Sequence, residues 1–317
     1  MIKKINPFLK IIFVVFIFYL ILSKVDFILF YQILANAKIE YFFLMCLLWP
    51  VGLFISVLRW KLFLKKYGLN VSIKEAFNLY WIGSFFNNFL PTSFGGDGYK
   101  FFVLNNKFKN KKSKILSSIV LERGFGFFTI LLFIVFFGLF FFGKIFSNIF
   151  LLMTYFISLT IVIIFLIYLL TSPRFFIKKK FKSPLLNKIR NFINTLGSFK
   201  ERGVITKAIL WSVLFLSISI FSMFLCFRAF DGKVNFFVLL FLIPLVHFSE
   251  LIPFTINSLG VKEGLGIYLF SLFEIKPEIS LAVFLTSRLL LTLCSLTGGL
   301  KYIFTKVLKN ENILDWN

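Results

Sequence analysis

Residues 90–97 read LPTSFGGD, and residues 252–264 read IPFTINSLGVKEG. Each stretch contains a Pro, then Gly, then an acidic residue, which is Asp97 in the first stretch and Glu263 in the second. Pro lacks a backbone donor and clashes with the preceding helical turn, while Gly permits a sharp reversal of the chain. Both stretches are therefore expected to interrupt a helix.

An Arg lies deep in the apolar run that follows each stretch. Arg123 comes 26 positions after Asp97, and Arg288 comes 25 positions after Glu263. In a membrane protein, interrupted hydrophobic segments at matching places in two halves are the best sequence indication of a transport site. We therefore expect two copies of one structural unit.

The composition is that of a membrane protein. Hydrophobic residues make up 59% of the 317 positions, including 50 Phe, and charged residues make up only 15%. Soluble domains carry about 25% charged residues, so the apolar surface of this chain is expected to face lipid. The net charge of +23 lies in short loops between apolar runs. Cytoplasmic loops of membrane proteins collect such charge, and we expect no nucleic-acid partner.

Six apolar runs approach the length of a membrane span, for which a hydrocarbon core about 30 Å thick requires roughly 20 apolar residues. We predict an all-α polytopic membrane protein with about six spanning helices. One integral membrane domain is expected over residues 1–310, with a short polar tail at 311–317. The six runs are approximately residues 8–22, 41–58, 115–142, 149–170, 204–227 and 279–300.

Loop charge predicts the orientation. Residues 59–74 contain five basic residues and no acid, residues 100–114 contain six Lys, and residues 174–202 contain nine basic residues and one acid. Loops rich in Lys and Arg lie on the cytoplasmic side. We therefore expect a multi-pass protein of the cytoplasmic (inner) membrane with both termini in the cytoplasm.

With this orientation, neither interrupted stretch can cross the membrane once. Residues 75–99 lie between two cytoplasmic loops, and residues 236–273 lie between two outside loops. Each stretch is expected to enter and return as a re-entrant hairpin, from opposite faces of the membrane. Two inverted-topology repeats result, at about residues 8–142 and 149–303.

The breaks expose backbone groups that lipid cannot satisfy, so they must be buried in protein or line a wet cavity. Free N–H groups at the start of a half-helix attract anions. Asp97 and Glu263 occupy these first-turn positions, either as helix caps or as ligands. The predicted hairpin-break residues are Pro91, Gly95, Gly96, Pro253, Gly260 and Gly264.

Arg123 and Arg288 are expected to face the bundle interior, because a charge at the centre of a membrane helix costs roughly 2.5 to 3.5 kcal/mol. Two roles stay open. Each Arg either pins a hairpin to the next helix through an ion pair with a nearby acid, or binds an anion, since guanidinium holds phosphate through two parallel hydrogen bonds. The predicted substrate-binding residues are Arg123, Arg288, Asp97, Glu263, Glu250, Asn88 and Asn257.

His247 is the only His and precedes Glu250 by three positions. The pair either relays a proton from one helical face, or His247 is simply hydrogen-bonded to a neighbour. The acids show no metal-ligand spacing, so we expect no metal, no cofactor and no enzyme activity. Cys46, Cys226 and Cys294 lie in apolar runs without paired spacing, and no disulfide framework is expected.

Several motifs together resemble the lysylphosphatidylglycerol synthase transmembrane family, also called flippase-like membrane proteins. The resemblance covers about residues 10–305. It implies a protein that moves lipids or lipid-linked intermediates between leaflets. The motifs are Arg59-Trp60, the series from Asn88 to Asp97, Leu121-Glu122-Arg123, the series from Ile252 to Gly264, and Arg288.

Bifunctional members of that family carry a soluble synthase domain. This chain ends at Asn317, soon after the last apolar run, so the resemblance implies the stand-alone branch without the synthase domain. The expected function is transport of a phospholipid or a polyprenyl-linked anionic intermediate, with the bilayer and an envelope-synthesis protein as partners. The alternatives are an intramembrane lipid-linked transferase and a scaffold for an envelope-synthesis partner.

Overall fold

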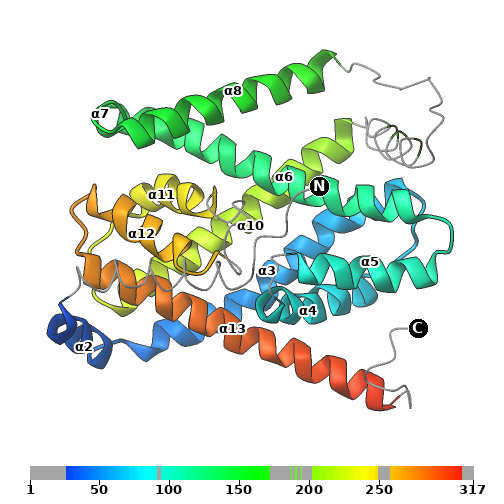
Figure 1. The fold of residues 1–317 in the computed structure, drawn as a ribbon, viewed down its shortest axis with the longest axis horizontal. Helices are drawn as coiled ribbons and strands as arrows, with labels where there is room; N and C mark the ends of the chain where they lie inside the picture. The colour runs from blue at the N-terminus through cyan, green and yellow to red at the C-terminus, as the bar shows by residue number, and fades with distance from the viewer. Residues whose placement is uncertain are drawn as a thin grey trace. The chain divides into compact units, whose positions relative to one another are not determined.

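The structure, a computed structural model, describes residues 26–90, 94–171, 202–248 and 258–308, with three isolated positions between residues 187 and 194. These residues are mostly helical and contain no strand (Figure 1). Several sequence predictions lie outside the described residues. They are the apolar run 8–22, Pro91, Glu250, Pro253, Asn257 and the tail 311–317.

Within the described residues, five helices are long and apolar enough to cross a membrane. They coincide with five of the six predicted runs, and the prediction of an all-α polytopic membrane protein is confirmed. Large apolar side chains on them, such as Phe136, Ile164 and Leu210, are exposed, which suits a surface against lipid. The five are α3 (Ile39–Lys66), α6 (Lys112–Gly138) with its continuation to Phe146, α8 (Ile149–Thr171), α10 (Arg202–Ala229) and α13 (Pro277–Leu308).

Two pairs of shorter helices occupy the predicted hairpins. Helices α4 (Ile73–Phe89) and α5 (Gly95–Lys107) flank the first break, and α11 (Phe236–Phe248) and α12 (Val261–Ser271) flank the second. Their entry into the membrane from opposite faces stays a prediction. The remaining elements are α2 (Phe27–Ala35), the 3-10 helix η1 (Leu139–Phe141) and α7 (Phe142–Phe146).

Helices α4 and α5 run antiparallel. At the break, the Gly96 N–H donates to Asn87 Oδ1 over 2.7 Å, and a Cβ on Gly96 would lie 2.3 Å from the carbonyl oxygen of Gly83. At the opposite ends of the two helices, Lys107 Nζ lies 2.6 Å from Glu75 Oε2. The chain therefore reverses its direction between α4 and α5, as the Pro and Gly residues predict.

The basic segment 100–114 is mostly helical, and one expectation drawn from it is wrong. Helix α5 continues to Lys107 and α6 begins at Lys112, so only residues 108–111 connect them. Lys100, counted as a charge in a cytoplasmic loop, is only 4% exposed. The physical reason is its spacing, because three positions after Asp97 it lies over the same carboxylate in the first turns of α5.

The contacts divide the chain into two compact units. Unit 1 comprises Met1–Gly52, Trp81–Gly96 and Ser217–Asn317, and unit 2 comprises Leu53–Tyr80 and Asp97–Leu216. The division falls inside α3, α4, α5 and α10, so each unit takes residues from both halves of the sequence. The inverted repeat stays a prediction.

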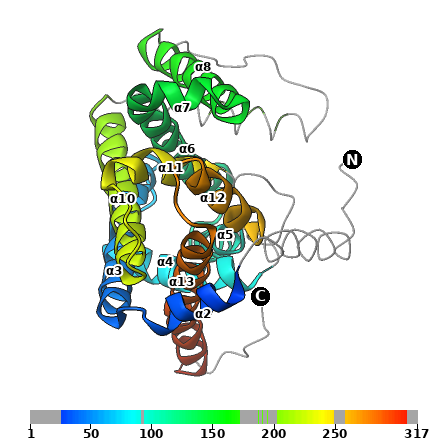
Figure 2. The ribbon, with the colours of Figure 1, turned by 90° about the vertical axis from the view of Figure 1, so that its left-hand side faces the viewer.

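In unit 2, α6 packs along α8, as Figures 1 and 2 show. Trp60, Leu104 and Ile115 are fully buried in its core, and the ring of Phe63 stacks on that of Phe125. This packing fixes α3, α5 and α6 as neighbours, which matters for the charged side chains they carry.

In unit 1, α13 packs against α2 and α12 (Figure 2). The ring of Phe270 stacks on Phe227 and meets Phe284 edge-on. Gly266 allows this approach, because a Cβ there would lie 2.2 Å from the ring of Phe284. The close packing holds the start of α12 against α13, where Glu263 and Arg288 lie.

Candidate functional site

The second break ends at a buried ion pair in unit 1. Glu263 lies in the first turn of α12, with a side chain only 1% exposed. Its Oε1 accepts a hydrogen bond from Arg288 Nε over 2.5 Å, and its Oε2 accepts one from the backbone N–H of Gly260 over 2.8 Å. Glu263 therefore acts as a helix cap and as the partner of Arg288 at once.

The backbone before α12 reverses sharply. Ser258 and Gly260 have φ angles of 56° and 81°, in the region that glycine adopts most easily. The carbonyl oxygen of Ser258 accepts a further hydrogen bond from Arg288 Nη2 over 3.5 Å. Gly264 lies inside α12, where its N–H donates to the Gly260 carbonyl over 2.8 Å. The break thus ends at Gly260.

The first break leads to a corresponding ion pair in unit 2. Asp97 lies in the first turn of α5, and its Oδ2 accepts a hydrogen bond from Arg123 Nε. Its other oxygen, Oδ1, lies 2.8 Å from Lys100 Nζ. The predicted pairing of Arg123 with Asp97 is present, and Asp97 also holds a second cation that sequence reasoning missed.

A second buried carboxylate extends this site. Glu122 Oε1 accepts a hydrogen bond from Arg59 Nη2, and Glu122 Oε2 lies 3.8 Å from Lys100 Nζ. We call Arg59, Asp97, Lys100, Glu122 and Arg123 the charge cluster. It contains three positive and two negative side chains, and all but Arg123 are buried.

Aromatic rings and a small residue surround the charge cluster. Lys100 Nζ lies 4.1 Å from the ring centroid of Tyr80 and 5.0 Å from that of Trp60, an arrangement that favours a cation. A Cβ on Gly126 would lie 3.2 Å from Arg59 Nη1, so Gly126 leaves room for the guanidinium. Within the described part of the chain, the buried Arg59 Nε has no hydrogen-bond partner.

The two break-associated Arg residues differ in exposure. The side chain of Arg123 is 41% exposed, whereas that of Arg288 is 21% exposed. The side chains of their carboxylate partners, Asp97 and Glu263, are 10% and 1% exposed. The site at the first break is therefore the more open of the two.

Asn88 contacts α13. Its Nδ2 donates to Ser295 Oγ over 2.9 Å. On the same helix, Trp81 Nε1 donates to Thr297 Oγ1 over 2.8 Å. Gly298 accommodates the carbonyl oxygen of Trp81, which would lie 2.3 Å from an added Cβ. These contacts give Asn88 a part in joining α4 to α13 within unit 1.

His247 lies near the end of α11, and its Nε2 is 3.2 Å from Ser219 Oγ. Glu250, the other member of the predicted proton relay, and Asn257 lie outside the described residues. The relay therefore stays a prediction, and the Ser219 contact provides the neighbour that the simpler interpretation requires.

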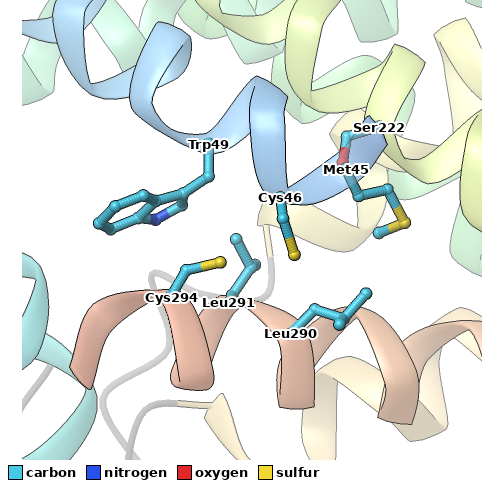
Figure 3. Close-up of a pocket in the computed structure, with 7 residues that line it drawn as sticks. All are labelled: Met45, Cys46, Trp49, Ser222, Leu290, Leu291 and Cys294. Atoms are coloured by element: carbon cyan, nitrogen blue, oxygen red, sulfur yellow. The ribbon is translucent and has the colours of Figure 1, made fainter. Parts of the chain in front are cut away.

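A small pocket in unit 1 contains none of the predicted site residues (Figure 3). Cys46 of α3 and Cys294 of α13 both point into it, with their thiols within hydrogen-bonding reach of each other. Both thiols are free. The sequence spacing gave no sign of this pair. The lining residues are Met45, Cys46, Trp49, Ser222, Leu290, Leu291 and Cys294.

Sequence reasoning missed three members of the charge cluster. Arg59 lies just beyond the predicted apolar run 41–58, yet α3 continues to Lys66. Glu122 adjoins Arg123 in the sequence, but its carboxylate accepts a hydrogen bond from Arg59. The one usable signal was the spacing of Lys100 from Asp97, because residues three positions apart share a helical face.

Comparison with known proteins places the chain in a family. A sequence profile described as the lysylphosphatidylglycerol synthase TM region matches residues 8–299. The chain belongs to this family. The match includes both breaks and both of their Arg residues, so the paired sites lie within the family's shared region.

Two curated relatives match over most of their length. UPF0104 membrane protein MJ1595 of Methanocaldococcus jannaschii is 27% identical over 303 residues, covering 88% of this chain and 88% of the relative. UPF0104 membrane protein PH1989 of Pyrococcus horikoshii is 23% identical over 314 residues, covering 89% and 91%. Both names describe membrane proteins, in agreement with the five apolar helices found in this member of the lysylphosphatidylglycerol synthase TM family.

Proposed function

We propose that this protein moves a phosphate-bearing lipid between the two leaflets of the membrane. The lipid is a phospholipid or a polyprenyl-linked anionic intermediate. The observation that carries the proposal is the charge cluster, which places three cationic side chains together near a helix break. Membership of a family described by a lipid synthase supports a lipid as the substrate.

The energetic cost of burying ionisable side chains favours a functional role for the charge cluster. Ionisable side chains within membrane helices are costly, and they commonly mark the path of a substrate or an ion. The five side chains carry one more positive than negative charge. A phosphodiester carries one negative charge, and guanidinium groups suit its oxygens in geometry and charge.

In the proposed transport, the headgroup passes the polar site while its acyl chains stay in lipid. The breaks contribute by freeing backbone N–H groups at the starts of α5 and α12, which favour negative charge. No covalent bond to the lipid forms or breaks, so the protein is proposed to act as a transporter and not as an enzyme.

The test uses purified protein in vesicles that contain a fluorescent phosphatidylglycerol. A membrane-impermeant reductant quenches the labels exposed in the outer leaflet, and the remaining signal reports the lipid that has stayed in the inner leaflet. Wild-type protein is expected to lower the protected signal below that of protein-free vesicles, and Arg123→Gln is expected to abolish this effect.

Lys107→Gln is the matched control. It removes a cation from an ion pair in the same hairpin, where Lys107 and Glu75 have side chains 43% and 29% exposed. This variant should translocate lipid like the wild type. Equal protected signals for wild-type and protein-free vesicles would reject the proposal, as would turnover of a lipid-linked donor by the protein in detergent, where no leaflets exist.

A further inference from the structure

The two Arg–carboxylate pairs have the same spacing but unlike surroundings. Resting on the proposed function, we infer that Arg123 is the guanidinium that leaves its carboxylate to bind the lipid phosphate, while Arg288 and Glu263 form a permanent lock. Lys100 is the positioning residue that makes the exchange at Arg123 possible.

The first step of the argument concerns Asp97. Its two oxygens serve different cations, Oδ2 accepting from Arg123 and Oδ1 lying 2.8 Å from Lys100. When Arg123 turns toward a phosphate, Asp97 keeps a buried cation at hydrogen-bonding distance. The departure therefore does not leave a bare carboxylate, which is the state that makes breaking a buried ion pair unfavourable.

The second step concerns Lys100, which must stay in place during this exchange. Its ammonium lies between Asp97 and Glu122 and over the rings of Tyr80 and Trp60. Glu122 is in turn held by Arg59. Each of these contacts favours a fixed cation, so Lys100 continues to compensate Asp97 with or without Arg123.

The third step concerns Glu263, whose surroundings differ. Among the described residues its partners are one cation, Arg288, and one backbone donor, the Gly260 N–H. Departure of Arg288 would leave a carboxylate that is 1% exposed without a cation, and would loosen the start of α12. Arg288 is therefore held at Glu263.

The sequence shows the same difference between the two ion pairs. Lys100 follows Asp97 by three positions, and the residue three positions after Glu263 is Gly266, which has no side chain and lies against Phe284. The residue before Arg123 is Glu122, whereas the residue before Arg288 is Ser287. The exposures agree, at 41% for Arg123 and 21% for Arg288.

The test measures binding and does not depend on transport. Detergent-purified protein is heated with increasing amounts of phosphatidylglycerol, phosphatidylcholine or inorganic phosphate, and the gain in melting temperature gives a half-saturation concentration. Wild type is expected to be stabilised by phosphatidylglycerol more than by phosphatidylcholine. Arg123→Gln should raise the half-saturation concentration at least about tenfold, because it removes a hydrogen-bonded charge.

The double variant Glu263→Gln with Arg288→Gln removes the lock without leaving a bare charge, and it should bind phosphatidylglycerol like the wild type. A second, more conservative comparison covers the case in which this variant does not fold. Arg288→Lys keeps the ion pair and should leave binding unchanged, whereas Arg123→Lys loses the planar fork and should weaken it. Lys100→Gln should also weaken binding, and Lys100→Arg should restore it.

Equal loss of binding in the Arg123 and Arg288 variants would overturn the assignment, as would full binding in Arg123→Gln. Stabilisation by inorganic phosphate equal to that by phosphatidylglycerol would show a free anion as the ligand and overturn the lipid assignment. Failure of the transport proposal looks different, because the wild type would bind phosphatidylglycerol as expected yet move no lipid in vesicles.

Discussion

Arg288 donates a hydrogen bond from Nε to Oε1 of Glu263 over 2.5 Å and thereby joins a helix break to a helix 25 positions further along the chain. The bond from Arg123 Nε to Asp97 makes the same connection across 26 positions. Both bonds use the same donor atom and an acid in the first turn after a break. This agreement supports the predicted repeat.

The first prediction concerns the stability of the second break. Arg288→Gln leaves the Glu263 carboxylate buried without a cation, which should lower the stability of the folded state by about 3 to 5 kcal/mol. The measurement is the fraction of protein that stays monodisperse in detergent after heating, followed by tryptophan fluorescence on size exclusion.

The double variant Glu263→Gln with Arg288→Gln serves as its control, since it replaces the ion pair by two neutral groups. It should recover most of the lost stability. A double variant as unstable as Arg288→Gln would show that the guanidinium acts through other contacts and not through Glu263.

The second prediction concerns the close approach of α4 and α5. In Gly96→Ala the new methyl would lie 2.3 Å from the carbonyl oxygen of Gly83, so the hairpin must open or the helices must shift. We expect a fall in melting temperature of several degrees and lower expression. Gly98→Ala is the control in the same helix, because a Cβ there meets nothing within 4 Å. Equal melting temperatures for the two variants would contradict the packing.

Much of the fold could be predicted because its causes are local. Pro and Gly interrupt a helix wherever the surrounding fold allows, and a charge in a long apolar run must find a partner, so the breaks and their Arg residues stand out in the sequence. Asp97 and Glu263 could also be predicted from a local cause. First-turn positions after a break favour a carboxylate, whatever the rest of the chain does.

The charge cluster could not be assembled in this way. Arg59 and Glu122 lie 63 positions apart, and only the packing of α3 against α6 brings them together. Lys100 begins a segment with six Lys, where a buried cation is hidden among loop charges. Asn88 was predicted as a substrate-binding residue because it lies next to the first break. Its partner Ser295 lies 207 positions away, and no local pattern points to that contact.

The third prediction concerns orientation. Lys109 and Lys233 are both exposed and lie in connections that are predicted to be on opposite sides of the membrane. In a variant without Cys46, Cys226 and Cys294, Lys233→Cys should react with an impermeant maleimide added to intact cells, whereas Lys109→Cys should react only after lysis. Labelling of both positions in intact cells would contradict the predicted topology and the inverted repeat with it.

The last prediction concerns the thiols of Cys46 and Cys294, which point into one pocket from α3 and α13 (Figure 3). Both are partly accessible, and they lie within hydrogen-bonding reach of each other. A diazene oxidant accepts two electrons and two protons from such a pair and leaves a disulfide. Oxidised protein should therefore resist maleimide at both positions, and peptide mass spectrometry should find the two cysteines joined.

Cys226 provides the internal comparison. Its thiol is buried and donates to the carbonyl oxygen of Val283 over 3.5 Å, so it should take no part in the cross-link. Cys226→Ala should therefore leave the disulfide unchanged, while Cys46→Ala or Cys294→Ala should abolish it. Because the disulfide would tie α3 to α13, transport that depends on their relative movement should stop on oxidation and return on reduction. Undiminished maleimide labelling of Cys46 and Cys294 after oxidation would show that α3 and α13 do not meet at this pocket.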